Sequence, residues 1–230
     1  MKSPRRISLS EDLIKLDVST KPPPPCSLFW KMWHSCTDIE NEALETHFVQ
    51  GIKSGSLDPV KYGGFNVSDA YYCFHGAQVY LEAECRTEDK ILRAFLLEKY
   101  KSYQKYNEKF PTIWHVRDAR GVVPIDVCKR YSQFESDIAS HEKPIYCIIV
   151  MIPCEHLWYW LAHQFAPPAP ENLYAGWIIE NNDPKPAYAL GNFLNDYQKK
   201  HPGEIDENKA IEIYTQAMTY EKENFRAAGS

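Results

Sequence analysis

A cysteine follows a proline inside the longest apolar run of the chain, residues 145–161. The run is too long for a typical buried strand and predicts a helix, in which Pro153 lacks a backbone N–H and clashes with the carbonyl group of Ile149. We therefore expect a kink beside Cys154. A thiol at a kinked turn can face freed carbonyl groups, aromatic rings and a cavity, which makes Cys154 a candidate nucleophile. Free cysteines more often act as small apolar core residues, so the run alone leaves both roles open.

Other polar side chains stand among aromatic residues on further predicted helices. Side chains three or four positions apart share a helix face, and four such helices could converge on one pocket. Each residue also has an ordinary interpretation, as a helix N-cap, a core tyrosine with a paired hydroxyl or a solvated acid. The candidates are Asp69 and Tyr72 on one helix, Tyr131 on a second, Cys154 and Trp158 on a third, and Glu221 and Asn224 on the last.

The elements that must position these residues are helices. No alternating apolar run with hairpin signals and no nucleotide-binding glycine motif occurs in the sequence, so an all-α bundle is the simplest interpretation. Residues 1–26 are polar and contain four consecutive prolines, Pro22–Pro25, which favour an extended spacer. We expect a flexible proline-rich tail over 1–26 and one helical domain over 27–230. Within it the spacing predicts helices near 27–50, 59–63, 66–85, 88–107, 125–140, 144–165, 172–181, 186–200 and 206–226.

Charge and cysteine content narrow the classes of function. The 230 residues carry 26 basic and 31 acidic side chains, and no basic cluster exceeds a pair, which argues against a nucleic-acid partner. The seven cysteines include no C-x-x-C pair, so we expect reduced thiols in a cytoplasmic protein. No secretory signal is visible, and no apolar run reaches the ~18 residues of a membrane span. A small-molecule partner fits best.

Five segments, in the same order along the chain, resemble motifs of the TenA proteins, the thiaminase II group. The motifs read H-P-F-V-Q-G-I-x-x-G-x-L, Q-D-x-x-Y, L-L-P-C, Y-x-x-W-I and Y-E, and the matching segments lie within a region of about residues 27–226. The segments are His47–Leu57, Ser68–Tyr72, Met151–Cys154, Tyr174–Ile178 and Tyr220–Glu221.

The resemblance implies a heme-oxygenase-like all-α bundle, assembled as a homotetramer or dimer. It implies a cysteine-dependent C–N hydrolase that releases 4-amino-5-hydroxymethyl-2-methylpyrimidine from aminopyrimidines or thiamin, in thiamin salvage or degradation, with no metal or other cofactor. By the same resemblance, Cys154 would be the nucleophile, Asp69 would hold the amidine edge of the pyrimidine and Glu221 would exchange protons with the ring. Tyr72 and Tyr131 would orient the carboxylate and the thiol.

Three positions depart from the family pattern. Trp158 and Asn181 stand where the family has tyrosines, and Asn224 stands where it has phenylalanine. Because these side chains would line the substrate, the preference among thiamin, an aminopyrimidine and another pyrimidine stays open.

Other functions remain alternatives. They are a thiaminase I-type transfer of the pyrimidine to an added nucleophile and a non-catalytic pyrimidine-binding protein. A non-heme iron oxidase would need paired E-x-x-H ligands, which the sequence lacks.

Overall fold

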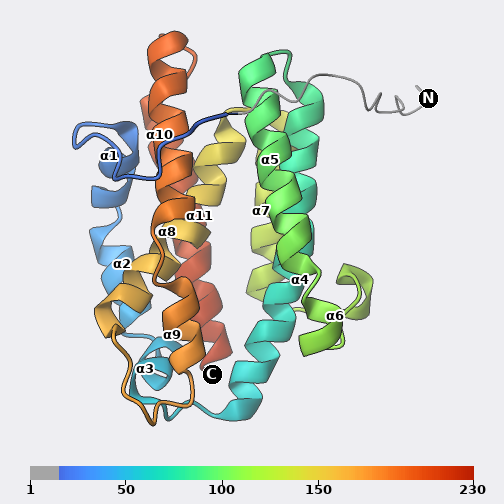
Figure 1. The fold of residues 1–230 in the computed structure, drawn as a ribbon, viewed down its shortest axis with the longest axis vertical. Coiled ribbons are helices and arrows are strands. Elements are labelled where there is room, and N and C mark those ends of the chain that lie inside the picture. The colour runs from blue at the N-terminus through green and yellow to red at the C-terminus, as the bar shows by residue number, and fades with distance from the viewer. Residues whose placement is uncertain (1–15) are drawn as a thin grey trace.

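The computed structural model describes residues 16–230, so the first fifteen residues of the predicted tail lie outside it. Among the described residues every regular element is a helix (Figure 1), as the sequence predicts. The α-helices are α1 (Leu28–His34), α2 (Thr37–Leu44), α3 (His47–Ser54), α4 (Pro59–Arg86), α5 (Lys90–Asn107), α6 (Phe110–Ile113), α7 (Asp126–His141), α8 (Tyr146–Phe165), α9 (Ala175–Asn181), α10 (Lys185–Lys200) and α11 (Glu207–Ala228), and the 3₁₀ helix η1 (Ala119–Gly121) lies between α6 and α7.

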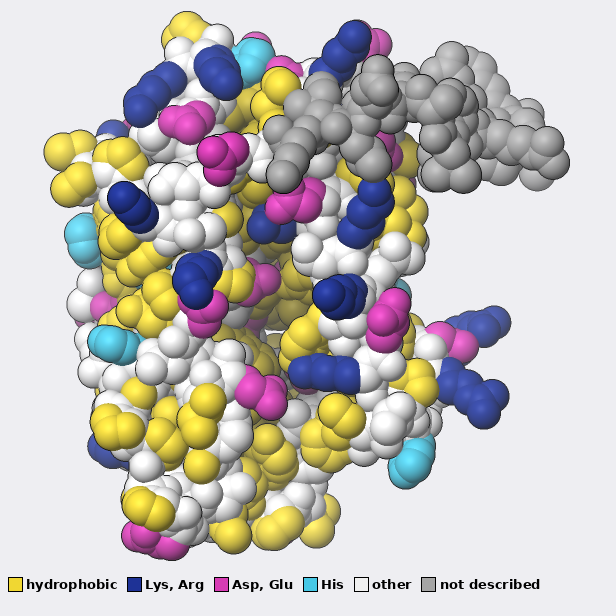
Figure 2. All heavy atoms as spheres, in the orientation of Figure 1, with side chains coloured by type: hydrophobic (Ala, Val, Ile, Leu, Met, Phe, Trp, Pro, Cys, Tyr) yellow, Lys and Arg dark blue, Asp and Glu magenta, His cyan; other side chains and the backbone are white. Residues whose placement is uncertain are grey.

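The longer helices form two groups. Helices α4, α5 and α7 pack together, and α8 packs with α10 and α11 (Figure 1). Helix α7 also contacts α8 and α11 and so joins the groups. The face shown in Figure 2 is hollowed between α5 and α10, with acidic and apolar side chains inside the hollow and lysine or arginine side chains around it.

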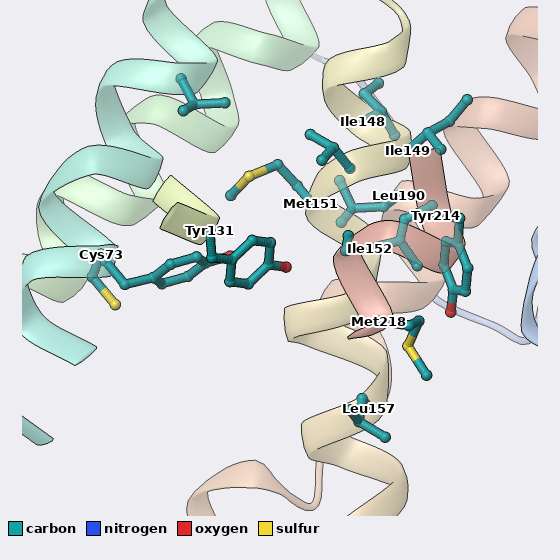
Figure 3. Close-up of a cluster of buried hydrophobic side chains, with 14 of the residues drawn as sticks. Cys73, Tyr131, Ile148, Ile149, Met151, Ile152, Leu157, Leu190, Tyr214 and Met218 are labelled. Carbon is teal, nitrogen blue, oxygen red and sulfur yellow. The ribbon is translucent and has the colours of Figure 1, made fainter. Parts of the chain in front are cut away.

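Helix α8 supplies much of the core. It contacts α4, α7, α9, α10 and α11, and residues 146–153 are all buried. Because neighbours surround this run on every side, its apolar character is continuous rather than confined to one stripe. The helix predicted there is confirmed, and it continues through Pro153. Figure 3 shows part of the core contributed by α8, α10 and α11: Ile148, Ile149, Ile152, Leu190, Tyr214 and Met218.

Helix α4 is longer than the sequence pattern indicates. The two helices predicted for this region form one helix, Pro59–Arg86. Its N-terminus is capped by Asp58, whose side chain accepts a hydrogen bond from the backbone N–H of Val60 at 2.8 Å. Gly63 and Gly64 lie inside the helix although glycine costs about 1 kcal/mol there. Packing of the buried residues that follow outweighs this local cost. Helices α5 and α7 to α11 begin and end within about one turn of their predicted bounds.

Helices α4 and α7 run parallel, side by side. At the start of α7, the backbone N–H of Ile125 donates to Oγ of Ser68, in the first half of α4, at 3.0 Å. Near their ends, the guanidinium group of Arg86 donates to the carbonyl oxygen of Ala139. The middle of α4, with Tyr72, therefore faces the middle of α7.

Part of the segment predicted as a tail is packed against α10. The side-chain amide of Asn192 donates to the carbonyl oxygens of Ser19 at 2.9 Å and Lys21 at 2.7 Å. Pro23 is buried, and its carbonyl oxygen accepts a hydrogen bond from the indole N–H of Trp30 at 3.0 Å. A proline-rich segment makes no hydrogen bonds within itself, so side chains of the helical domain hold it in place.

Gly191 lies where this segment crosses α10. A Cβ atom there would lie 2.6 Å from Cδ2 of Phe29 and 2.8 Å from Cγ of Pro23. We expect Gly191→Ala to lower the free energy of unfolding by about 1–3 kcal/mol through overpacking. Gly64→Ala, at an exposed helical position where the new methyl meets open space, should instead raise it by roughly 0.5–1 kcal/mol. Urea unfolding of the two variants and the wild type measures these changes in the free energy of unfolding. Wild-type stability of Gly191→Ala would contradict this packing.

Candidate active site

The thiol of Cys154 contacts a phenol that the sequence interpretation did not assign to the site. Its Sγ atom lies 3.4 Å from Oη of Tyr103, on α5, and 3.4 Å from the carbonyl oxygen of Met151. The same Tyr103 hydroxyl donates to Oε1 of Glu155 at 3.5 Å. The phenol thus stands between the sulfur and the carboxyl group of the next residue. Tyr103 belongs to a set of tyrosines spaced by three on α5, and Glu155 adjoins the cysteine, so both carried a signal in the sequence.

The surroundings of this thiol favour its protonated form. Burial is the largest cause, and the carboxyl groups of Glu155, Glu221 and Glu135 add to it, so that the pKa of Cys154 lies well above its ordinary value. A thiolate, the nucleophilic form, therefore needs a neighbouring group that accepts the proton.

Glu221 is a buried acid on α11, 2 % exposed. Its Oε2 atom accepts a hydrogen bond from Nε1 of Trp158 at 3.0 Å. Burial raises the pKa of Glu221 to about 8, and the carboxyl groups of Asp69 and Glu155 raise it further against the Trp158 hydrogen bond. At neutral pH this group is largely protonated and can donate a proton. Trp158, which departs from the family pattern, therefore contributes both an aromatic ring and a hydrogen bond to the carboxyl group of Glu221.

Asp69, on α4, is the second acid that the sequence predicts for the site. Burial raises its pKa to about 7, while the charge of Lys109 and a hydrogen bond from Cys73 act in the opposite direction. The Cys73 thiol donates to Oδ2 of Asp69 at 3.8 Å. Near neutral pH the carboxyl group of Asp69 exists in both protonation states, so it can accept or share a proton with a ligand.

Glu135, on α7, was missed by the sequence interpretation. It is fully buried, and its Oε1 atom accepts a hydrogen bond from the hydroxyl of Tyr72 at 2.7 Å. The Tyr72 ring stacks on that of Tyr131 at 5.1 Å, and Tyr131 stacks on Tyr220 at 5.5 Å. Glu135 follows Tyr131 by four residues, and this shared helix face was the available signal.

Two oxygen atoms in this part of the cluster lack partners. Within residues 16–230, neither Oε2 of Glu135 nor Oη of Tyr131 has a hydrogen-bond partner, although both atoms are buried. The hydroxyl of Tyr131 lies near the carboxyl groups of Glu135 and Glu221 without hydrogen-bond geometry to either. Buried polar atoms are usually paired, so these atoms are available to the polar edge of a ligand.

The two asparagines predicted for the site lie in different settings. Asn224 is buried one turn after Glu221, and its Oδ1 atom has no partner among the described residues. Asn181 ends α9, and its side-chain amide donates to the carbonyl oxygen of Trp177 at 2.8 Å. No hydrogen bond within the described part of the chain joins either asparagine to Cys154 or Glu221.

One ion pair links the end of α5 to α9. Lys109, between α5 and α6, has its Nζ atom 4.0 Å from Oε2 of Glu180 on α9 and 3.7 Å from the ring centre of Tyr106. The charge of Lys109 also lowers the pKa of Asp69, so this cation lies near a buried acid of the cluster.

Two cavities occur elsewhere on the surface. They measure about 400 and about 300 Å³ and lie along α4 and α7. Residues such as His75 and Gln133 line the first and Gln78 and Glu82 the second, and neither cavity includes a residue of the predicted site. The thiol and the buried acids instead gather where α4, α5, α7, α8 and α11 meet, so we place the candidate site there on its chemistry.

Within residues 16–230, no three histidine, cysteine, aspartate or glutamate side chains are placed to hold a metal ion. No helix in the same range has the length and apolar character that a membrane span requires.

Asp69 and Glu221 make the stability of the fold depend on pH. Their pKa values, about 7 and about 8 in the folded state, exceed the ordinary values of 3.8 and 4.5. The folded state therefore binds more protons than the unfolded state between roughly pH 4 and pH 8, and the free energy of unfolding falls as the pH rises through this range. We expect a loss on the order of a few kcal/mol, since one pKa unit corresponds to about 1.4 kcal/mol.

Urea unfolding at about pH 5.5 and about pH 8.5 measures this loss. Asp69→Asn and Glu221→Gln should each reduce it, because neither amide titrates. An unchanged pH slope in both variants would contradict the assignment.

No family model and no curated protein matches this sequence. Solved structures match over most of the chain. A TenA homologue from P. horikoshii OT3 aligns with a TM-score of 0.75 and 17% identity, covering 89% of this chain and 100% of that one. A TenA family transcription regulator from Silicibacter sp. TM1040 aligns with a TM-score of 0.72 and 15% identity, covering 88% of this chain and 96% of that one. A TenA-like protein from Sulfolobus solfataricus P2, described as a proposed thiaminase, aligns with a TM-score of 0.66 and 13% identity, covering 86% of this chain and 94% of that one.

These likenesses cover nearly the whole length of the solved chains at low sequence identity, so they concern the fold. The helical bundle that the sequence predicted through its resemblance to the TenA family is confirmed at that level. The chain therefore has the all-α fold of the TenA proteins.

Proposed function

We propose that the protein is a cysteine-dependent hydrolase of aminopyrimidines or thiamin, of the thiaminase II type. One observation carries the proposal: a half-buried thiol, Cys154, lies near buried acids that hold protons near neutral pH. The pKa values of about 8 for Glu221 and about 7 for Asp69 support it. The fold of the TenA proteins, one of which is described as a proposed thiaminase, points to the same chemistry.

In the proposed reaction Cys154 acts as the nucleophile and Glu221 exchanges protons with the ring. The thiolate of Cys154 adds to the electron-poor ring carbon next to the substituted position, and the resulting electron shift expels the amine or the thiazole from the exocyclic methylene. Water adds to that methylene and gives up one proton, which replaces the proton that a departing amine takes with it, and loss of the thiolate restores the aromatic ring. Glu221 gives a proton to the ring nitrogen as sulfur adds and takes it back when the ring is restored.

Binding of the pyrimidine uses the remaining groups. A carboxylate such as Asp69 can accept two roughly parallel hydrogen bonds from the amidine edge of an aminopyrimidine when a ring nitrogen is protonated. Trp158 stacks on Phe65 with ring centres 5.7 Å apart and lies 5.6 Å from the ring of Phe225. Flat aromatic rings of this kind favour a flat heterocycle.

Product analysis tests this function. Purified protein is incubated with thiamin, its formylamino fragment and aminomethylpyrimidine, each with and without pyridine. Release of 4-amino-5-hydroxymethyl-2-methylpyrimidine without a pyridine adduct would support hydrolysis, and an adduct would support the thiaminase I-type transfer. Calorimetric binding without product would support the non-catalytic alternative. Absence of both turnover and binding for all three compounds would overturn the proposal.

The assembly and location follow the same resemblance. We propose a cytoplasmic homo-oligomer, a tetramer or a dimer, which light scattering of the full chain would test. One structural neighbour is described as a transcription regulator. The formal charge of -5 and the absence of a basic cluster in this sequence do not favour direct contact with nucleic acid.

A further inference from the structure

We propose that Tyr103 and Glu155 form a proton relay that deprotonates the Cys154 thiol, an inference that rests on the proposed nucleophilic role of Cys154. The proton on Sγ passes to Oη of Tyr103 while the phenolic proton of Tyr103 passes to Oε1 of Glu155. The products are a thiolate, a neutral tyrosine and a neutral carboxylic acid, so the total charge and the number of protons are unchanged.

The geometry places the phenol between its two partners. Oη of Tyr103 lies 3.4 Å from Sγ of Cys154 and 3.5 Å from Oε1 of Glu155. A tyrosine hydroxyl both donates and accepts, so a single group can connect the two. Such distances shorten when a site closes on its substrate.

The ring of Tyr103 is held in place by α4. A Cβ atom at Gly76 would lie 2.8 Å from Cε1 of Tyr103, so glycine at this position lets α4 approach the ring closely. Tyr80, one turn later on α4, packs edge-on against the same ring with centres 5.4 Å apart. The phenol is therefore positioned by packing in advance of any ligand.

The titratable groups around the pair leave Glu155 as the acceptor. Tyr103 donates to Glu155, whereas the donor to Glu135 is Tyr72 and the donor to Glu221 is Trp158. Facing Cys154 are also Tyr72, Cys73 and Tyr80 of α4 and Tyr131 of α7. None of these is an anion near neutral pH, since burial raises the pKa of each well above its ordinary value.

Glu155 itself faces Lys99, Tyr103 and Tyr106 of α5, Cys73 and Tyr80 of α4, and Glu221 of α11. Lys99 and Tyr103 favour its ionised form, whereas burial acts more strongly and raises its pKa. A carboxylate with a raised pKa accepts a proton more readily than an ordinary one, and the charge of Lys99 favours its ionised form.

Alkylation of Cys154 by iodoacetamide tests the relay without any substrate. The rate at this one thiol among seven is followed by mass spectrometry across a range of pH. In the wild type we expect a plateau between the ionisation of Glu155 and that of the thiol, because an internal proton transfer does not depend on pH there. In Tyr103→Phe and Glu155→Gln the plateau should be absent, and the alkylation rate should rise about tenfold per pH unit. At neutral pH both variants should react at least roughly tenfold more slowly than the wild type.

The sign of the Glu155→Gln effect separates a relay from a neighbouring charge. If Glu155 acted only as a nearby anion, its removal would lower the pKa of the thiol and speed alkylation. Faster alkylation, or a wild-type profile in both variants, would overturn the relay. Tyr100→Phe on α5 and the exposed Glu98→Gln are matched controls, and both should keep the plateau. Circular dichroism of each variant checks folding.

This test is independent of turnover. Activity that requires Cys154 but keeps its pH profile in Tyr103→Phe and Glu155→Gln would overturn the relay and leave the proposed function standing. A plateau in a protein that turns over no pyrimidine would overturn the proposed function and support the relay.

Discussion

Replacing Cys154 with serine is expected to lower turnover of the best pyrimidine substrate by at least about 10³-fold. A hydroxyl has a far higher pKa than a thiol, and the carboxyl groups of Glu155, Glu221 and Glu135 surround the position, so no alkoxide forms there near neutral pH. The remaining activity would reflect binding and orientation alone. Serine is close to cysteine in size and can keep the hydrogen bond to the carbonyl oxygen of Met151, so the fold should persist.

Single-turnover kinetics with the substrate found by product analysis measures this effect. Cys85→Ser is the matched control, because Cys85 is an exposed free thiol on α4 outside the cluster, and it should keep wild-type activity. Wild-type turnover in Cys154→Ser would remove the thiol from the mechanism. Equal and negligible turnover in the wild type and in Cys154→Ser, with binding retained, would favour the non-catalytic alternative.

Glu221→Gln is expected to lower kcat/KM by roughly 10²–10⁴-fold, the usual contribution of a positioned general acid. Glutamine has the shape of a protonated glutamate and can still accept the hydrogen bond from Trp158, so binding should suffer less than chemistry. Since the pKa of Glu221 is about 8, the acid form predominates below this pH. Wild-type activity should therefore fall by about tenfold per pH unit above it.

The pH profile separates this role from a structural one. In Glu221→Gln the alkaline fall near pH 8 should disappear, because an amide does not titrate. Trp158→Phe removes the indole N–H that lowers the pKa of Glu221 and retains an aromatic ring, so the fall should move to higher pH. An alkaline fall at the same pH in all three proteins would assign it to another group.

The helices were largely predictable because their signals are local. The continuous apolar run of α8 and the breaks near Pro59, Pro111 and Pro167 mark helix positions through nearest neighbours along the chain. The fusion of two predicted helices into α4 was not predictable, because the cost of Gly63 and Gly64 is local whereas the packing that outweighs it is not.

The candidate site was predictable only in part. The sequence indicated Asp69, Cys154 and Glu221 through spacing and family resemblance, and the structure places these three among buried groups. The sequence interpretation treated Trp158 as a departure from the family pattern that would line the substrate, although its indole N–H donates to Glu221. Glu135 was missed because an acid on an amphipathic helix resembles a solvated one until packing shows that it is buried.

Local order along the chain determined which segments are helical and which residue types could carry chemistry, since both depend on neighbours a few positions apart. The tertiary structure alone decided which groups surround the sulfur. Tyr103 lies 51 positions before Cys154, and it reaches the thiol because α4 and α5 pack closely at Gly76. No periodicity within one helix encodes a contact between two, because such contacts arise from how whole helix faces fit together.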